Sequence, residues 1–127
     1  FPFPEVDHYV PESTVWLRMG REYRTRFINR NLRIYYSGEN PSRDRDRTVR
    51  SKRGMMMHRK CILEEHFDYF PYSPFDFLHI STDYAMFSYL LGNGVWHTVK
   101  NIKGFRQRLL VLFTYYPGRL KAKREYV

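Results

Sequence analysis

Residues 61 to 99 contain no lysine or arginine, yet they hold ten aromatic side chains and five acids. The flanking stretches are strongly cationic, with fourteen Lys/Arg against four acids in residues 13 to 60 and eight against one in residues 100 to 127. Only the central stretch can bury many side chains without also burying cations. The sequence therefore predicts that residues 61 to 99 supply the packing, with a cationic surface on either side.

Length and composition predict one folded domain. A chain of 127 residues buries about two-thirds of the surface that its unfolded form exposes. Its hydrophobic content of 43% supplies enough apolar area to offset the loss of chain entropy. We expect an extended Pro/aromatic arm at residues 1–12, a single domain at 13–118 with a mobile basic loop at 38–54, and a basic tail at 119–127.

Two periodicities compete near the start of the predicted domain, over residues 13–30. An apolar stripe from Val15 to Phe27 fits one side of a helix, while the alternation that begins at Tyr23 fits a strand. The longer stripe favours the helix. Alternating apolar residues at 32–36 then predict a strand.

Two further helices are expected in the middle of the chain. The first covers residues 55–70 and is ended by Pro71, which cannot continue a helix. The second begins at a cap formed by Ser81 or Thr82 and ends before Gly92. Between them lies an irregular Pro/aromatic connector.

The C-terminal third reads as a β-hairpin. Residues 95–99 alternate, residues 100–104 form a turn, and residues 105–116 are rich in strand-forming side chains up to Pro117. The predicted fold class is therefore α+β: a small antiparallel sheet, including this hairpin, packed against two or three helices, with an extended N-terminal arm and a basic C-terminal tail.

Possible metal ligands are close together in the sequence at His58, Cys61 and His66. Zinc sites in proteins hold four ligands in recognisable pairs, and a fourth ligand here would come from a distant residue. A core cysteine with surface histidines is the better interpretation. We predict no metal and no cofactor, and keep a small metal-binding enzyme only as a weak third hypothesis.

Motifs for catalysis are weaker still. Ser81 stands near His79 and Asp83, but neighbours two positions apart do not make a catalytic triad, and a helix cap explains Ser81. The glycines at 92 and 94 follow a predicted helix instead of opening one, so they favour a helix stop over a phosphate loop. The sequence predicts a protein that is not an enzyme.

Arginine dominates the positive charge of the chain. Sixteen of its 22 cations are arginine, and the formal net charge is +9. Guanidinium groups bind phosphate in planar, bidentate geometry and stack on rings, which favours RNA, phospholipid head groups or acidic protein faces as partners. The candidate RNA- or anion-binding residues lie in the basic loop, on the predicted hairpin and in the tail: Arg43, Arg45, Arg47, Arg50, Lys52, Arg53, Arg106, Arg108, Arg119, Lys121, Lys123 and Arg124.

The predicted hairpin suggests how some of these residues would act. Arg106 and Arg108 would share one face of a strand while the other face packs on the core. Tyr35 and either Tyr115 or Tyr116 could stack on unpaired bases. In the alternative, these tyrosines complete the rim of the core and the arginines pair with acidic neighbouring subunits.

The expected compartment follows from the cysteine content and the first residue. Cys61 is the only cysteine, so it cannot form an intramolecular disulfide, which disfavours a small secreted scaffold. The chain begins at Phe1, as after removal of a targeting peptide or in a trimmed chain. No apolar run approaches the length that crosses a bilayer. We expect a mitochondrial location, or otherwise a cytoplasmic one, and no transmembrane segment.

Together these features predict a non-enzymatic structural subunit of a large intracellular assembly. In the leading hypothesis it resembles an organellar ribosomal protein in composition, with RNA phosphate on its Arg-rich loop and tail and other protein subunits on residues 61–99. In the alternative it is a peripheral accessory subunit of a mitochondrial respiratory or ATP-synthase-type complex, where the cations meet anionic lipid head groups or acidic subunits.

Overall fold

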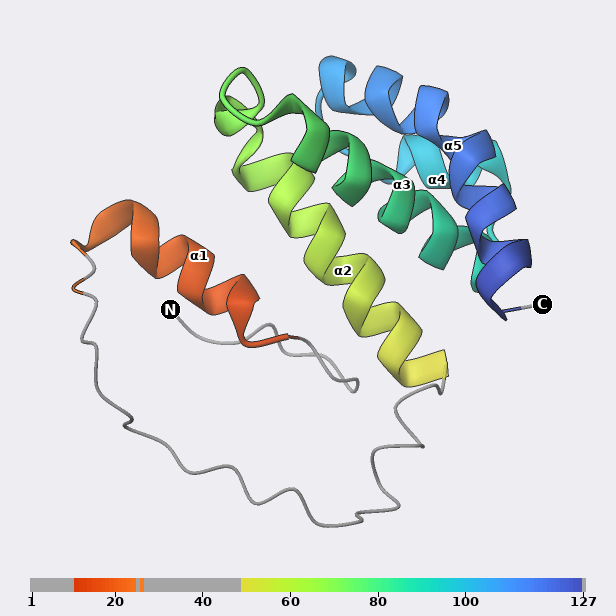
Figure 1. Cartoon of the computed structure of the whole chain (residues 1–127), viewed down its shortest axis with the longest axis horizontal. Coiled ribbons are helices and arrows are strands. Elements are labelled where there is room, and N and C mark those ends of the chain that lie inside the picture. Colours follow the sequence, from red (N-terminus) through yellow and green to blue (C-terminus); the bar gives the residue numbers. More distant parts are fainter. Residues whose placement is uncertain (1–10, 25, 27–48, 127) are drawn as a thin grey trace, which may run out of the picture.

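The chain folds as a helical bundle in the computed structural model, which describes residues 11–24, 26 and 49–126. Side chains at 49–51 lie outside the description. Within these ranges there are five α-helices and one short 3-10 helix (Figure 1). They are α1 (Ser13–Glu22), α2 (Val49–Glu65), η2 (Phe67–Tyr69), α3 (Pro74–Leu90), α4 (Val95–Lys100) and α5 (Phe105–Tyr126).

The predicted α+β fold class is wrong, because the described ranges contain helices and no strand. The expected hairpin is the helix pair α4–α5. Its second strand, residues 105–116, is the first half of a 22-residue helix. The expected basic tail from 119 is the last part of that same helix, which runs through Pro117. The strong strand propensity of these residues is overridden by packing, since their buried positions recur with a helical period.

In the N-terminal half, the described residues test only some of the expectations. Residues 13–22 form the favoured helix, α1. The segment 49–54, expected at the end of the mobile basic loop, is the start of α2. The predicted strand at 32–36, the loop at 38–48 and the first ten residues of the arm lie outside the described residues.

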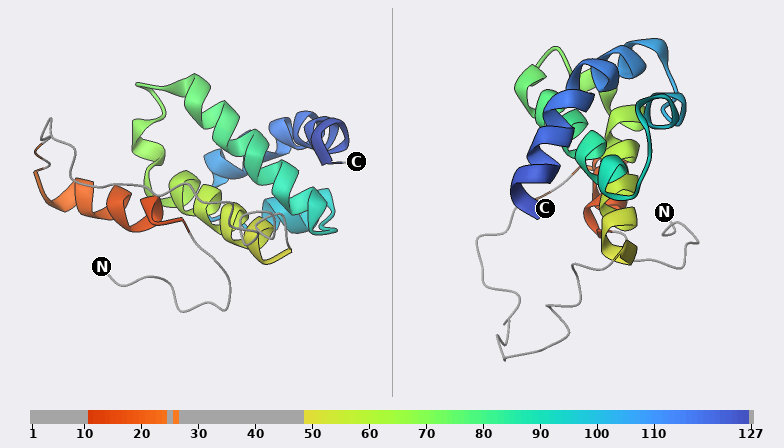
Figure 2. Two further views of the ribbon diagram at one scale, coloured as in Figure 1. Left: turned by 60° about the horizontal axis from the view of Figure 1, so that its bottom comes forward. Right: turned by 90° about the vertical axis from the view of Figure 1, so that its right-hand side faces the viewer.

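Helix α3 is the centre of the bundle and packs mainly against α5 and α2 (Figures 1 and 2). One hydrophobic cluster is built from the buried side chains of Leu63, Phe77, Tyr84, Ile102 and Val111. Three of these five come from the central stretch without lysine or arginine, and two come from the cationic C-terminal stretch. The core therefore extends into a part of the chain that charge alone assigns to the surface.

Small side chains let α3 and α5 approach closely. A Cβ atom added at Gly118 would lie 2.7 Å from the carbonyl oxygen of Thr82 and 2.8 Å from the Cβ of Ala85. One turn earlier, the hydroxyls of Ser81 and Thr114 are 2.6 Å apart and share a buried hydrogen bond. Ser81 is thus part of the helix contact and not the helix cap that its sequence position suggests. The backbones can touch here because neither helix has a side chain in the way.

Both ends of α3 follow local rules. Pro74 occupies its first turn, where the missing N–H has no helical partner in any case. At the other end, the N–H groups of Gly92 and Asn93 donate to the carbonyls of Tyr89 and Ser88, and Gly92 has a φ of 82°. This double hydrogen bond is the Schellman motif. The prediction that Gly92 stops the helix is confirmed.

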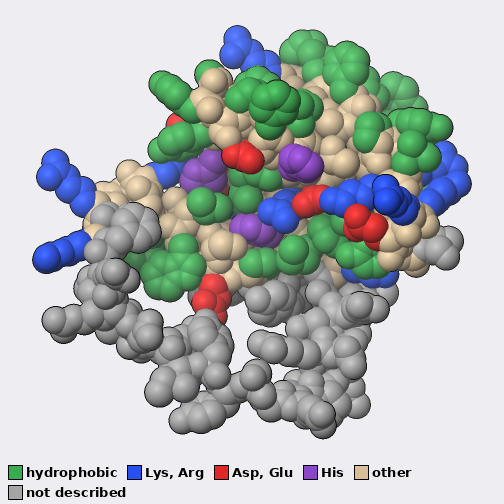
Figure 3. Space-filling view, viewed as in Figure 1, with side chains coloured by type: hydrophobic (Ala, Val, Ile, Leu, Met, Phe, Trp, Pro, Cys, Tyr) green, Lys and Arg blue, Asp and Glu red, His purple; other side chains and the backbone are tan. Residues whose placement is uncertain are grey.

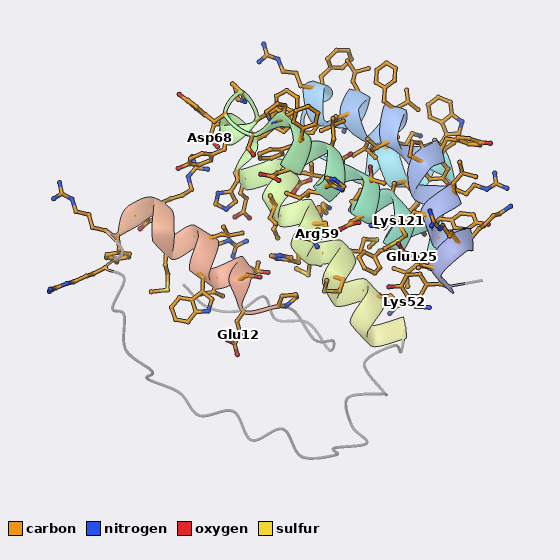
Figure 4. The ribbon with its side chains drawn as sticks, in the orientation of Figure 1. Glu12, Lys52, Arg59, Asp68, Lys121 and Glu125 are labelled. Carbon is orange, nitrogen blue, oxygen red and sulfur yellow. The ribbon has the colours of Figure 1, made fainter. Side chains whose placement is uncertain are left out.

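An acidic side chain links three helices through ion pairs. Asp83 of α3 lies 3.2 Å from the Arg59 guanidinium of α2 and 2.8 Å from the Lys121 ammonium of α5. Figure 4 labels Arg59 and Lys121, which belong to the two helices that pack against α3. The hydrogen bond from Lys121 to Asp83 raises the pKa of Lys121. Arg59 and Lys121 therefore help to hold α2, α3 and α5 together.

Helix α1 is attached to α2 largely through polar contacts, at one side of the bundle (Figure 2). Arg18 donates two hydrogen bonds of 2.6 and 2.7 Å to the carboxylate of Glu65, and Arg21 donates to Asp68. The bonds from Arg18 lower the pKa of Glu65. Part of the apolar surface of α1 stays uncovered by the described residues, since Trp16 and Leu17 keep 62% and 39% of their surface exposed.

Candidate interaction surface

The three possible metal ligands are not assembled into a site. His58 is buried, and its Nδ1 lies 2.9 Å from the hydroxyl of Thr14 on α1. Burial, with a smaller effect from Arg59, lowers the pKa of His58 to about 4, so its imidazole is neutral at pH 7. His66 is also buried, which corrects the expectation of surface histidines. Across the described ranges, no three His, Cys, Asp or Glu side chains gather in a way that could hold a metal ion.

Cys61 is half-buried beside the Arg18–Glu65 pair. Its burial raises the pKa of the thiol, and Glu65 acts in the same direction. A reactive cysteine needs the opposite shift, toward the thiolate. The side chain therefore acts as a packing residue at the junction of α1 and α2.

Several of the predicted anion-binding residues contact this chain instead. Lys121 forms the ion pair with Asp83 described above. Arg119 lies over the ring of Tyr89, with 5.5 Å from its guanidinium carbon to the ring centre, and Lys52 lies over Tyr126 at 5.7 Å. Arg108 donates from Nε to the carbonyl of Ile102 at 2.7 Å. These four side chains therefore already make contacts within the chain. Each of them is less available to an external anion than the sequence predicted.

A second group of predicted residues keeps its charge exposed. Arg53, Arg106, Lys123 and Arg124 have no ion pair with the acidic side chains that the structure describes. Arg50 lies in α2, where its side chain is not described. The remaining candidates, Arg43, Arg45 and Arg47, lie outside the described residues, as does Tyr35.

The helical form of residues 105–126 changes how Arg106 and Arg108 are arranged. Two residues two positions apart share a face of a strand, but on a helix they are about 200° apart. The expectation that these two arginines present one common face is therefore wrong. They flank the outer side of α5 from opposite edges.

Between these edges, the outer face of α5 is apolar. Its exposed side chains recur every three or four residues, and Phe105 and Phe113 keep 74% and 77% of their surface accessible. We call this set the α5 stripe; it consists of Phe105, Leu109, Leu112, Phe113, Tyr116 and Leu120. Figure 3 shows hydrophobic side chains gathered along the edge of the molecule where Figure 1 places α5. The inner face of the same helix packs on α3, whereas each side chain of the stripe keeps 40–77% of its surface uncovered by the described residues.

A groove adjoins the first half of the α5 stripe. It has a volume of about 780 Å³ and lies between η2 with its flanking residues and the start of α5. Its apolar lining comes from Phe67 and Phe70 on one side and from Leu109, Leu110 and Phe113 on the other. Arg106, Glu64, Glu65 and Asp68 stand among the lining residues. The groove and the stripe share Leu109 and Phe113, so they form one continuous surface.

Sequence reasoning missed this surface because it assigned the wrong period to residues 105–116. The signal is present in the helical period: positions 109, 112, 113, 116 and 120 lie on one side, and positions 111, 114, 118 and 122 lie on the other. A helix with apolar residues on both sides needs a cover for each. Tyr115, one of the two tyrosines proposed to stack on bases, donates to the carbonyl of Asn93, whereas Tyr116 belongs to the stripe.

None of the helices in the described part of the chain combines the length and the apolar character that spanning a bilayer requires. Comparison with models of protein families, with curated proteins and with solved structures finds no match for this chain.

Proposed function

We propose that this protein is a non-enzymatic structural subunit of a larger assembly, and that the α5 stripe packs against a neighbouring protein subunit. The observation that carries this proposal is the exposed apolar face of a helix whose other face already forms the core. Soluble monomers rarely leave contiguous apolar patches of more than a few hundred Å² in water. A patch of this kind is typical of a surface that is covered in the functional state.

The energy available at such a surface is substantial. Burying a Leu or Phe side chain that was fully exposed gains about 1.5–3 kcal/mol. In the α5 stripe, Phe105 and Phe113 keep about three-quarters of their surface exposed and Tyr116 keeps 64%, so they come nearest to this gain. The three leucines keep 40–50%, so each adds about half of it or less. Aromatic anchors near the centre of a patch, here Phe113 and Tyr116, are the residue types that dominate binding energies at protein interfaces.

The assembly that we favour is a ribonucleoprotein of the organellar ribosome type. In it the α5 stripe contacts protein, while the exposed Lys123 and the Arg-rich segment 43–53 contact RNA phosphate. In the alternative, a peripheral subunit of a mitochondrial membrane complex, the same cations meet lipid head groups. Both assemblies place a protein neighbour on α5, so this contact is the common part of the proposal.

Sedimentation of native extracts tests the common part. We expect the tagged wild-type chain to travel with a large particle, and a Phe113→Asp variant to shift to the free fraction, because a buried carboxylate at the centre of the interface is strongly unfavourable. Phe113 is largely exposed in the isolated chain, so the variant keeps its thermal unfolding midpoint.

The matched control is Trp96→Asp, which places the same charge on an exposed aromatic position of α4, outside the stripe. We expect this variant to stay with the particle. A wild-type chain that sediments alone would refute the proposed function, as would a Phe113→Asp variant that remains fully in the particle.

A further inference from the structure

Around the groove, the acidic side chains are paired within the chain, whereas one basic side chain is not paired with any described residue. Each groove carboxylate already has a cation from this chain: Glu65 binds Arg18, Asp68 binds Arg21, and Glu64 lies 3.9 Å from the ammonium group of Lys60. Arg106, by contrast, has no ion-pair partner within the described ranges. The groove therefore presents an apolar lining with one uncompensated positive charge.

Both edges of the α5 stripe are positive as well. Arg106 and Arg124 are separated by about five helical turns and lie on one edge, while Arg108 and Arg119 are separated by about three turns and lie on the other. Glu125 is the only acidic residue in α5. Arg108 and Arg119 make contacts with a carbonyl and a ring, neither of which neutralises their charge.

Resting on the proposed function, we infer that the occupant of the α5 stripe is an acidic amphipathic helix of a neighbouring protein. Its apolar side packs along the stripe, its aspartates and glutamates face the arginines on both edges, and one bulky apolar side chain enters the groove. The stripe extends from Phe105 to Leu120, a length of about 22 Å at 1.5 Å per residue. A partner helix of about four turns would cover it.

The shape of the surface favours a protein over a lipid or RNA occupant. A groove of about 780 Å³ lined by aromatic and aliphatic side chains accepts a protruding apolar side chain, which a layer of lipid head groups does not offer. RNA offers phosphates to the edges, but the leucines at 109, 112 and 120 give a polar backbone nothing to bind along the centre. Protein helices supply both an apolar centre and charged flanks.

A displayed library of helices tests the inference without assuming the identity of the partner. Its members have about 18 residues, with leucine or phenylalanine fixed at stripe-matching positions and all flanking positions randomised. The full chain serves as bait. We expect the selected helices to be enriched in Asp and Glu at the flanks, and to bind about tenfold more weakly to an Arg106→Glu, Arg124→Glu double variant.

A control double variant, Arg53→Glu with Lys100→Glu, carries the same change in net charge at exposed positions outside α5. We expect it to bind the selected helices as the wild type does. If both double variants lose affinity for the selected helices to the same extent, the loss reflects net charge alone, and the inference is overturned.

Two further arms use vesicles containing phosphatidylserine and a single-stranded oligouridine as probes. Selection of no helix, selection without acidic flanks, or binding through Phe113 to either probe instead of to helices would overturn the inference. The sedimentation experiment does not depend on the charge of the neighbour. If the chain joins a particle but selects no acidic helix, the proposed function therefore stands and only the acidic helix as partner is rejected.

Discussion

Replacing Gly118 by alanine is expected to lower the free energy of unfolding by about 1–3 kcal/mol, the range for overpacking a well-packed core. The new Cβ would lie within 3 Å of three atoms of α3, two of which belong to the backbone, so α3 and α5 have to move apart. An alanine in a helix is otherwise favoured over glycine by about 1 kcal/mol. The sign of the change in a urea titration therefore distinguishes the close crossing from simple helix propensity.

Gly20 provides the matched control. It lies in α1, and apart from the neighbouring backbone of that helix no described atom comes within 4 Å of a Cβ added there. We expect Gly20→Ala to be neutral or stabilising by up to about 1 kcal/mol. A Gly118→Ala chain as stable as this control would mean that α3 and α5 do not meet at Gly118.

Truncating Tyr84 to alanine is expected to cost about 3–5 kcal/mol of stability, the range for removing a large aromatic core residue. Its side chain is fully buried in the main cluster, and its hydroxyl donates to the carbonyl of Thr98 on α4 at 3.2 Å. Burial, with a smaller effect from Glu64, raises the pKa of Tyr84 to about 12. The phenol is therefore a neutral donor at every physiological pH.

A Tyr84→Phe variant separates packing from hydrogen bonding. It keeps the ring and leaves the Thr98 carbonyl without this donor, so we expect a loss of only about 0.5–1.5 kcal/mol. Thermal or denaturant unfolding measures both variants. A Tyr84→Ala chain no less stable than Tyr84→Phe would show that the ring is not packed in the core.

The sequence predicted the existence of α2 and α3 and the end of α3, but not their starts: α2 begins at 49 instead of 55, and α3 begins at Pro74 instead of at Ser81 or Thr82. Gly92 stops α3 because a residue with positive φ lets its own N–H and that of Asn93 donate back to the last carbonyls of the helix, and glycine adopts this φ without strain. The failure concerns residues 105–126. Valine, threonine and aromatics favour a strand, and Pro117-Gly118 reads as a chain reversal. In the folded chain the glycine instead meets the backbone of α3, a tertiary contact that no local pattern reveals.

The same limit applies to the candidate site. Composition predicted exposed cations, and Arg106, Lys123 and Arg124 have no ion-pair partner among the described residues. It could not show that Asp83, one residue in an acidic stretch, would meet Lys121 across two helices. Nor could it show that the apolar residues beside these cations stay uncovered. Both facts depend on the pairing of α3 with α5, which the hairpin hypothesis excluded.

The central claim is that a protein neighbour covers the α5 stripe in the native particle. A photo-crosslinking amino acid at position 113, activated in that particle, tests it most directly. We predict a single dominant crosslink whose partner peptide is an amphipathic helical segment with acidic flanks, and none from position 96, which lies on exposed α4. A crosslink from position 113 only to RNA or lipid, or no crosslink at all, would contradict the claim.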